Sequence, residues 1–235
     1  MKLLLKRYIL ISFILIVLPS ILWAQNKVYF DPQRFESAIA AFEAADKVSP
    51  PAPGGILFTG SSSIRFWHDR LARDMQGLTV IPRGYGGSTM QDAVYYINRV
   101  VLPYKPRAIV LYEGDNDIGA YDIPATQVRD LFQLFVAMVH DHLPQTRIYM
   151  LAIKPSILRQ KYWPQMQSAN SLLKAVCESD NRLYYIDVAS PLLLPDGSPN
   201  PELFREDNLH LNPEGYELWT SVVRPVLMVH EAQYE

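Results

Sequence analysis

The sequence predicts an α/β fold in which helices cover both faces of a five-stranded parallel sheet. Short apolar segments of about five residues alternate five times with longer segments whose apolar residues recur at helical spacing. This alternation is typical of three-layer α/β/α domains, because each parallel connection needs a crossover, usually a helix. A length of 235 residues with 49% hydrophobic residues suits one globular domain of this kind.

The five expected strands are recognised by their apolar, β-branched or aromatic residues. They lie at residues 55–59, 78–82, 108–112, 147–153 and 183–187. Residues 108–112 form an uninterrupted apolar run, which indicates a strand buried on both faces. The periodicity supports the layered architecture and leaves the order of the strands in the sheet open.

The expected helices follow the strands, and two of them have clear start signals. Asp31 precedes Pro32, and Asn212 precedes Pro213, so each helix would begin with a capping side chain ahead of proline at the first helical position. A Pro-rich connector at 49–54 separates the first helix from the first strand. One expected helix is about ten residues long and follows the first strand. The others lie at about 32–45, 90–101, 124–142, 166–177 and 213–230.

The first 24 residues have the pattern of a secretory signal peptide. Lys2, Lys6 and Arg7 precede an apolar run at 8–22, and Ala24 is a suitable last residue of the peptide. The chain then divides into a signal peptide at 1–24, an N-terminal helix and connector at 25–54, and the main domain at 55–235. Export to the periplasm or the extracellular space follows; the alternative is an uncleaved N-terminal membrane anchor.

Composition excludes several classes of partner. A net charge of −2, with no polybasic stretch beyond the N-terminus, gives no reason to expect nucleic acid, and no membrane contact is expected after signal removal. Cys177 is the only cysteine, which excludes an internal disulfide and a thiolate metal cluster; it is expected in the core. The glycine turn at 84–87 does not match a nucleotide-binding motif. The oligomeric state is left open.

Residues with catalytic potential follow the strands. Three serines, Ser61 to Ser63, follow the first strand, a glycine-rich turn at 84–87 follows the second, and Asn116 follows the third. Asp207 and His210 lie in the long loop after the fifth strand. Right-handed crossovers place all these turns at one edge of the sheet. We therefore expect the side chains to meet there.

Four motifs resemble the blocks of the SGNH, or GDSL-type, hydrolase family. Gly60-Ser61-Ser62-Ser63 matches the first block and Gly86-Gly87-Ser88-Thr89 the second. Gly114-Asp115-Asn116-Asp117 matches the third, and Asp207-Asn208-Leu209-His210 matches the last. Their order and spacing extend the resemblance over about residues 55–225. It implies the flavodoxin-like, three-layer SGNH-hydrolase fold and hydrolysis of carboxylic esters.

The resemblance also implies a role for each residue. Ser62 would be the nucleophile, with Ser61 and Ser63 as alternatives, because Ser61 stands where the family name implies Asp. His210 would act as its base and Asp207 would orient the imidazole. The oxyanion hole would comprise the backbone N–H groups of Ser62 and Gly87 and the side-chain amide of Asn116. No metal and no organic cofactor are implied.

The substrate is expected to be a small-molecule or glycan ester. The absence of large insertions in the loops predicts an open site that favours short acyl groups, with acetyl on a sugar as one candidate. The aromatic residues expected near the site, as candidates for stacking on a sugar ring, are Trp67, Tyr85, Tyr162 and Trp163. Three alternatives remain: acyl transfer at the same site, a non-catalytic glycan-binding module, and an Asx turn or cation site around Asn116.

Overall fold

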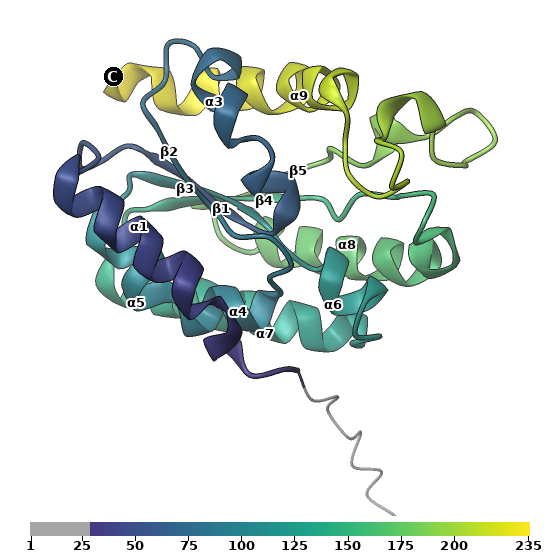
Figure 1. Cartoon of the computed structure of the whole chain (residues 1–235), viewed down its shortest axis with the longest axis horizontal. Helices are drawn as coiled ribbons and strands as arrows, with labels where there is room; N and C mark the ends of the chain where they lie inside the picture. Colours follow the sequence, from purple (N-terminus) through teal and green to yellow (C-terminus); the bar gives the residue numbers. More distant parts are fainter. Residues whose placement is uncertain (1–28) are drawn as a thin grey trace, which may run out of the picture.

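Five parallel strands form a sheet between two layers of helices in the computed structural model, which describes residues 29–235 (Figure 1). The strands are β1 (Ile56–Gly60), β2 (Val80–Gly84), β3 (Ala108–Tyr112), β4 (Arg147–Leu151) and β5 (Leu183–Ile186). They pair in the order β2-β1-β3-β4-β5, every pair parallel. This is the strand order of flavodoxin-like doubly wound sheets, so the predicted fold class is confirmed.

The helices divide between the two faces of the sheet (Figure 1). One face is covered by α2 (Ser62–Arg65), α3 (His68–Asp74) and α9 (Pro213–Glu231). The other is covered by α4 (Met90–Tyr95), α5 (Ile97–Val100), α7 (Ala125–His142) and α8 (Trp163–Glu178). The first helix, α1 (Glu36–Val48), packs on the second layer, and α6 (Asp115–Gly119) follows β3.

The core consists of two apolar layers separated by the sheet. Successive side chains of a strand point to opposite faces, and β3 supplies both layers. Its residues Ile109 and Leu111 face the α7 and α8 side, whereas Val110 and Tyr112 face the α9 side. Every residue of β3 is buried, as its continuous apolar run predicts. Cys177 is also buried, in agreement with its predicted place in the core.

Both predicted proline-capped helix starts are confirmed. The Asp31 side chain accepts a hydrogen bond from the Gln33 N–H and opens a 3₁₀ turn at Pro32–Phe35 that leads into α1. The Asn212 side chain accepts from the Gly215 N–H at 2.9 Å, with Pro213 at the first position of α9. A side-chain acceptor at this place satisfies one of the N–H groups that a helix start leaves unpaired.

Several elements differ from the sequence prediction. Strand β2 lies two residues later than predicted, because Gly84 pairs with Gly60 and the Arg83 side chain is held by Tyr104 and Asp46. The predicted helix at 90–101 is interrupted at Tyr96. Helix α6 occupies the segment expected to be a turn after the third strand.

The predicted signal peptide at residues 1–24 lies outside the described residues. Within residues 29–235, none of the helices combines the length and the apolar character needed to cross a membrane.

Candidate active site

Ser62 is the accessible member of the three serines that follow β1. Ser61 and Ser63 are each 2% exposed, whereas Ser62 is half-buried and begins α2. The turn depends on Gly60, whose φ of +134° is rare for other residues and whose added Cβ would lie 2.2 Å from the Tyr112 carbonyl oxygen. The glycine thus lets β1 approach β3 closely, and the chain turns so that Ser62 lies at the carboxyl edge of the sheet.

His210 lies between Ser62 and Asp207. Its Nε2 atom is 2.9 Å from the Ser62 Oγ, and its Nδ1 atom is 2.6 Å from Oδ2 of Asp207. The other oxygen of Asp207 accepts the backbone N–H groups of Leu209 and His210, each at 2.9 Å. Asn208 completes this tight turn with a φ of +58°. Ser62, His210 and Asp207 are thus connected through hydrogen bonds, across 148 positions of sequence.

The charge of Asp207 determines the tautomer of His210. Partial burial alone would raise the pKa of Asp207, but hydrogen bonds from the His210 side chain and from two backbone N–H groups lower it to about 2. An ionised Asp207 accepts the Nδ1 proton, which leaves Nε2 as the acceptor for the Ser62 hydroxyl. The arrangement is chemically suited to removing a proton from Ser62.

Gly87 lies in the turn after β2, and Asn116 lies in the first turn of α6 after β3. Gly87 has a φ of +89°, and a Cβ built on it would meet no heavy atom within 4 Å, so the space around it is open. The Asn116 amide donates to the Ser88 carbonyl at 2.8 Å through Nδ2 and has a second N–H to offer. Among residues 29–235, the Gly87 and Ser62 N–H groups donate to no protein acceptor. Each of these three residues therefore has an N–H group without a protein acceptor among residues 29–235.

A buried ionic cluster of Asp115, Lys154 and Arg159 fixes the Asn116 side chain. Arg159 donates to Oδ1 of Asp115 at 2.6 Å and to Oδ1 of Asn116 at 2.9 Å. Because the Asn116 oxygen is taken by Arg159, its NH₂ group is oriented the other way, toward Ser88. Lys154 donates to Oδ2 of Asp115 at 3.1 Å and to the Leu209 carbonyl at 2.8 Å. The cluster therefore links the Asn116 turn to the loop that carries Asp207 and His210.

The cluster is charged although it is almost inaccessible to water. Lys154 is 0% exposed and Asp115 is 4% exposed. Burial alone would raise the pKa of Asp115, but the Lys154 ammonium and the Arg159 guanidinium lower it to about 2. Burial lowers the pKa of Lys154, and the attraction of Asp115 opposes this effect. Because two cations already balance its charge and the Tyr112 hydroxyl also donates to it, Asp115 is poorly suited to hold a metal ion.

A second buried contact fixes the turn that carries Gly87. The Ser88 hydroxyl donates to Oε1 of Glu113 at 2.6 Å, which joins the turn after β2 to the end of β3. Burial raises the pKa of Glu113 well above its ordinary value, and the nearby Asp117 carboxylate adds to the effect. The neighbouring Asp117 carboxylate accepts from the Tyr29 hydroxyl and the Met90 N–H. No group of residues in 29–235 has the composition and spacing to hold a metal ion.

Two of the four aromatic residues predicted to contact substrate are core residues. Trp67 is 0% exposed, packs against Phe58 and donates its indole N–H to Asp74. Tyr85 is 2% exposed, with its ring against Phe35 and Tyr96. Trp67 has no exposed surface, so the prediction that it stacks on substrate is wrong. Tyr85 lines a cavity between α1 and the carboxyl edge of the sheet and stays a prediction. Tyr162 and Trp163 are half-buried at the start of α8 and stay predictions.

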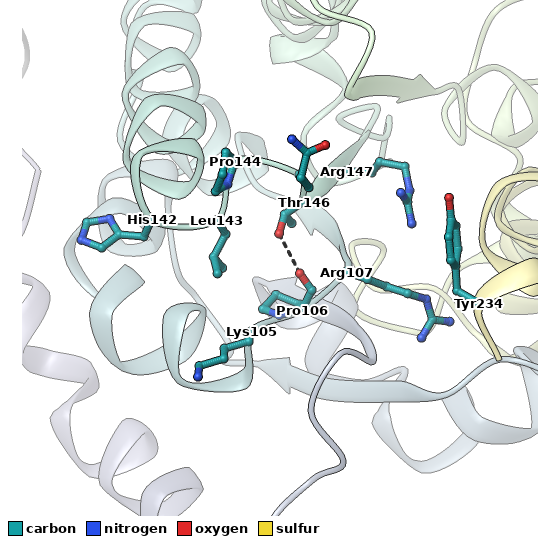
Figure 2. Close-up of a pocket in the computed structure, with 10 residues that line it drawn as sticks. Lys105, Pro106, Arg107, His142, Leu143, Pro144, Thr146, Arg147 and Tyr234 are labelled. Atoms are coloured by element: carbon teal, nitrogen blue, oxygen red, sulfur yellow. Dashed lines mark hydrogen bonds between the residues drawn. The ribbon is translucent and has the colours of Figure 1, made fainter.

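A cavity lies at the amino edge of the sheet, opposite the edge that carries Ser62, and Figure 2 shows the residues that line it. It has a volume of about 350 Å³, and its lining includes Arg107 and Arg147, which precede or begin β3 and β4. Both guanidinium groups donate to the buried carboxylate of Glu231. Because their charges are already paired and Ser62 lies at the other edge, this cavity is not part of the candidate active site.

Lys154 and Arg159 were missed by the sequence reasoning. A lysine ahead of proline, as in the segment after the fourth strand, is usually a solvated turn residue. Its position in the chain could have indicated a role at the site, because Lys154 follows β4 at the same edge of the sheet as Ser62, Gly87 and Asn116. Its burial depends on Asp115 and Leu209, which lie 39 and 55 positions away.

Comparison with known proteins agrees with this architecture. Residues 46–218 match the GDSL-like lipase/acylhydrolase family. No curated protein matches the chain. The fold is similar to a protein described as a platelet activating factor from Streptococcus pneumonia, with a TM-score of 0.72 and 21% identity over 82% of this chain and 92% of that one.

Two further solved structures share the fold. A GDSL-like lipase from Bacteroides thetaiotaomicron has a TM-score of 0.65 and 16% identity, over 85% of this chain and 98% of that one. An acetylxylan esterase from Geobacillus stearothermophilus has a TM-score of 0.59 and 15% identity, over 78% and 96% of the two chains. The family match spans most of the chain, and the sheet has the order expected for SGNH hydrolases. The chain therefore belongs to the GDSL-like lipase/acylhydrolase family and is a carboxylic ester hydrolase.

Proposed function

We propose that this protein is an exported serine esterase in which Ser62, His210 and Asp207 form the catalytic triad. The observation that carries the proposal is the continuous line of hydrogen bonds from Asp207 through His210 to Ser62. A serine hydroxyl is a weak nucleophile without an adjacent base, and His210 is within 2.9 Å of it. The burial of Ser61 and Ser63 supports Ser62 as the nucleophile.

The reaction follows from these positions in two halves. His210 Nε2 takes the Ser62 proton as Oγ bonds to the ester carbonyl carbon, and the same nitrogen then returns the proton to the leaving alkoxide. The acyl group is left on Ser62 and the alcohol departs. A water molecule, deprotonated by His210, then attacks the acyl-enzyme and releases the acid while Ser62 regains its proton.

The oxyanion of each tetrahedral intermediate would be bound by Ser62, Gly87 and Asn116. The Ser62 and Gly87 N–H groups have no protein acceptor in residues 29–235, and Arg159 holds the Asn116 amide with its NH₂ group toward this region. Removing one such donor typically raises the barrier by about 3 kcal/mol. Donors that are fixed before the reaction stabilise developing charge without a further cost of reorganisation.

We infer that the acyl group is short, with acetyl as the leading candidate. Support comes from the short connections after β1, β2 and β3 and from the structural neighbours that are named as acetyl esterases acting on xylan or xylo-oligosaccharides. Tyr162 and Trp163 remain candidates for contact with the alcohol. The pattern of residues 1–24 supports export with cleavage after Ala24, which leaves the segment 25–54 and the domain 55–235 in the mature protein.

The test of the triad is the Ser62→Ala variant. We expect kcat for an aryl acetate to fall by about 10⁴-fold or more, because triad members act as a unit. Ser171→Ala, which removes an exposed serine from α8, is the matched control and keeps full activity. Wild-type turnover by a folded Ser62→Ala variant would refute the proposal.

A further inference from the structure

A cavity of about 450 Å³ lies between α1 and the edge of the sheet that carries Ser62. Its lining includes Ala41 and Phe42 from α1, Arg65 and Asp69 from the segment after Ser62, and Gly86 from the turn after β2. Gly86 connects the cavity to the nucleophile. A Cβ built on Gly86 would lie 3.8 Å from the Ser62 Cβ and would have no other heavy atom within 4 Å.

Helix α1 forms the outer wall of this cavity. The residues matched by the family begin at 46, so most of α1 (Glu36–Val48) precedes them. The helix is held against the domain by Arg99, which pairs with Glu36 and Glu43, and by Arg83, which pairs with Asp46. The cavity wall that α1 supplies is therefore anchored at both ends of the helix.

Three polar side chains in the cavity have hydrogen-bonding capacity to spare. Neither the Arg65 guanidinium nor the Asp69 carboxylate has a partner among residues 29–235, and both are exposed. His68 accepts the Gly84 N–H at 2.9 Å through Nε2, so its proton is on Nδ1, which has no acceptor in the same residues. Burial, aided by Arg65 and Arg83, lowers the pKa of His68 to about 4, so the ring is neutral at pH 7.

The chemistry of the lining selects a class of ligand. One positive and one negative side chain cancel, so the cavity favours neither an anion nor a cation. Arg65 and His68 are donors, Asp69 is an acceptor, and the aromatic ring of Phe42 lines the same cavity. A sugar ring carries hydroxyl groups that both donate and accept, so it matches this combination of side chains. An acyl chain would gain nothing from these polar groups.

We propose that this cavity, which we call the α1 subsite, binds the alcohol part of the ester and that this alcohol is a neutral, hydroxyl-rich ring such as a sugar unit. The inference rests on the proposed function, since it places the leaving group relative to Ser62. Arg65 and Asp69 are its specificity-determining residues, and α1 is its outer wall.

The experiment compares three acetate esters: ethyl acetate, cyclohexyl acetate and a mono-O-acetyl methyl glycoside. All three form the same acetyl-enzyme, so differences in kcat/KM report the alcohol alone. Cyclohexyl acetate has the ring without the hydroxyl groups, and ethyl acetate has neither. Each variant is scored by ratios of kcat/KM, which removes effects common to all esters.

Arg65→Gln and Asp69→Asn test recognition of the hydroxyl groups. We expect each to lower the ratio of glycoside to cyclohexyl acetate about tenfold, the usual effect of losing one hydrogen bond to a charged group. Arg129→Gln, which removes a half-buried arginine of α7 paired with Asp130 and outside the cavity, is the control and leaves this ratio unchanged.

Ala41→Phe tests the steric role of α1. The added ring enters the cavity, so both ring esters should lose at least tenfold relative to ethyl acetate. Ala44→Phe adds the same ring on an exposed position of α1 outside the cavity and should leave the ratios unchanged. Circular dichroism of each variant checks that the fold is retained.

Ratios that stay within twofold of wild type in Arg65→Gln, Asp69→Asn and Ala41→Phe would overturn the inference. It would also be overturned if Ala41→Phe discriminated between acetyl and longer acyl esters of ethanol, because the cavity would then hold the acyl group. Ser62→Ala, measured on the same esters, separates the two failures. If Ser62→Ala keeps its activity, the serine esterase itself is refuted. If Ser62→Ala loses its activity while the ratios of kcat/KM in Arg65→Gln, Asp69→Asn and Ala41→Phe are unchanged, only the α1 subsite is refuted.

Discussion

Asn116 illustrates how one residue depends on others for its role. A free asparagine amide can rotate and present either its oxygen or its NH₂ group to an anion, and only the NH₂ group stabilises it. Arg159 removes this freedom by donating to the oxygen at 2.9 Å, while its other terminal nitrogen is held by Asp115. Arg159 is therefore a positioning residue, which acts on the reaction through Asn116.

Arg159→Lys tests this role at the scale of the residue. Lysine keeps a positive charge near Asp115 but lacks the planar fork that bonds two acceptors at once. We expect kcat to fall about tenfold with KM little changed, since the lost effect is exerted on the transition state. Steady-state kinetics on an aryl acetate measures both constants.

A double-mutant cycle distinguishes positioning from a general structural effect. Asn116→Ala alone should lower kcat by about 10²- to 10³-fold. If Arg159 acts through Asn116, adding Arg159→Lys to Asn116→Ala has no further effect. Independent, multiplicative losses would show that Arg159 acts in another way.

At the scale of the element, helix α9 shows why some boundaries were predictable. Its start depends on local chemistry, namely Asn212 as the cap and Pro213 at the first helical position. The same capped start places the loop that carries Asp207 and His210, because the loop ends where the helix begins. Signals of this kind are contained in four neighbouring residues and need no knowledge of the rest of the fold.

Removing the cap of α9 should weaken the whole domain. We expect Asn212→Ala to lower the free energy of unfolding by about 1 kcal/mol, because the Gly215 N–H loses its acceptor. Asn212→Asp keeps a carboxyl oxygen in place and should retain most of the stability. Urea denaturation of the three proteins measures the difference. Equal destabilisation by Ala and Asp would argue against a capping role.

Other elements could not be predicted from the sequence, because they depend on contacts between distant residues. Helix α6 begins after Gly114, whose φ of +107° and close approach to Ile153, just after β4, come from tertiary packing. The polar run from Asp115 to Asp117 looks like a turn, yet all three residues are buried because Lys154, Arg159 and Tyr29 partner them. Trp67 likewise was expected at the rim and is instead in the core.

The whole molecule brings acidic groups into its interior near the active site. Glu113, Asp92 and Asp117 are all 0% exposed, and burial raises the pKa of each of them. Glu113 at the end of β3 is the extreme case, because one of its oxygens has no partner in residues 29–235 and the other accepts only from Ser88. The folded protein therefore retains a proton on Glu113 where the unfolded chain has lost it.

This difference predicts the direction in which pH changes stability. The stabilising contribution of the protonated Glu113 is complete below the pKa of the unfolded chain, about 4.5. It is lost as pH rises toward the folded pKa, at up to about 1.4 kcal/mol per pH unit.

Glu113→Gln resembles the protonated acid at every pH and does not have this dependence. We expect wild type to lose stability relative to Glu113→Gln as pH rises from about 4.5, as measured by urea denaturation across pH. Glu178→Gln, at an exposed position of α8, should instead follow the wild-type curve. Parallel curves for wild type and Glu113→Gln would mean that Glu113 is ionised in the folded protein.

The central claim is that Ser62 is the activated nucleophile at the edge where five strand ends meet. Labelling the folded wild-type protein with a fluorophosphonate, followed by peptide mapping, tests it most directly. We expect a single adduct on the Ser62 oxygen in wild type. The adduct should form slowly in His210→Ala, because the hydroxyl then lacks its base. An adduct on another residue, or no adduct on folded protein, would contradict the account.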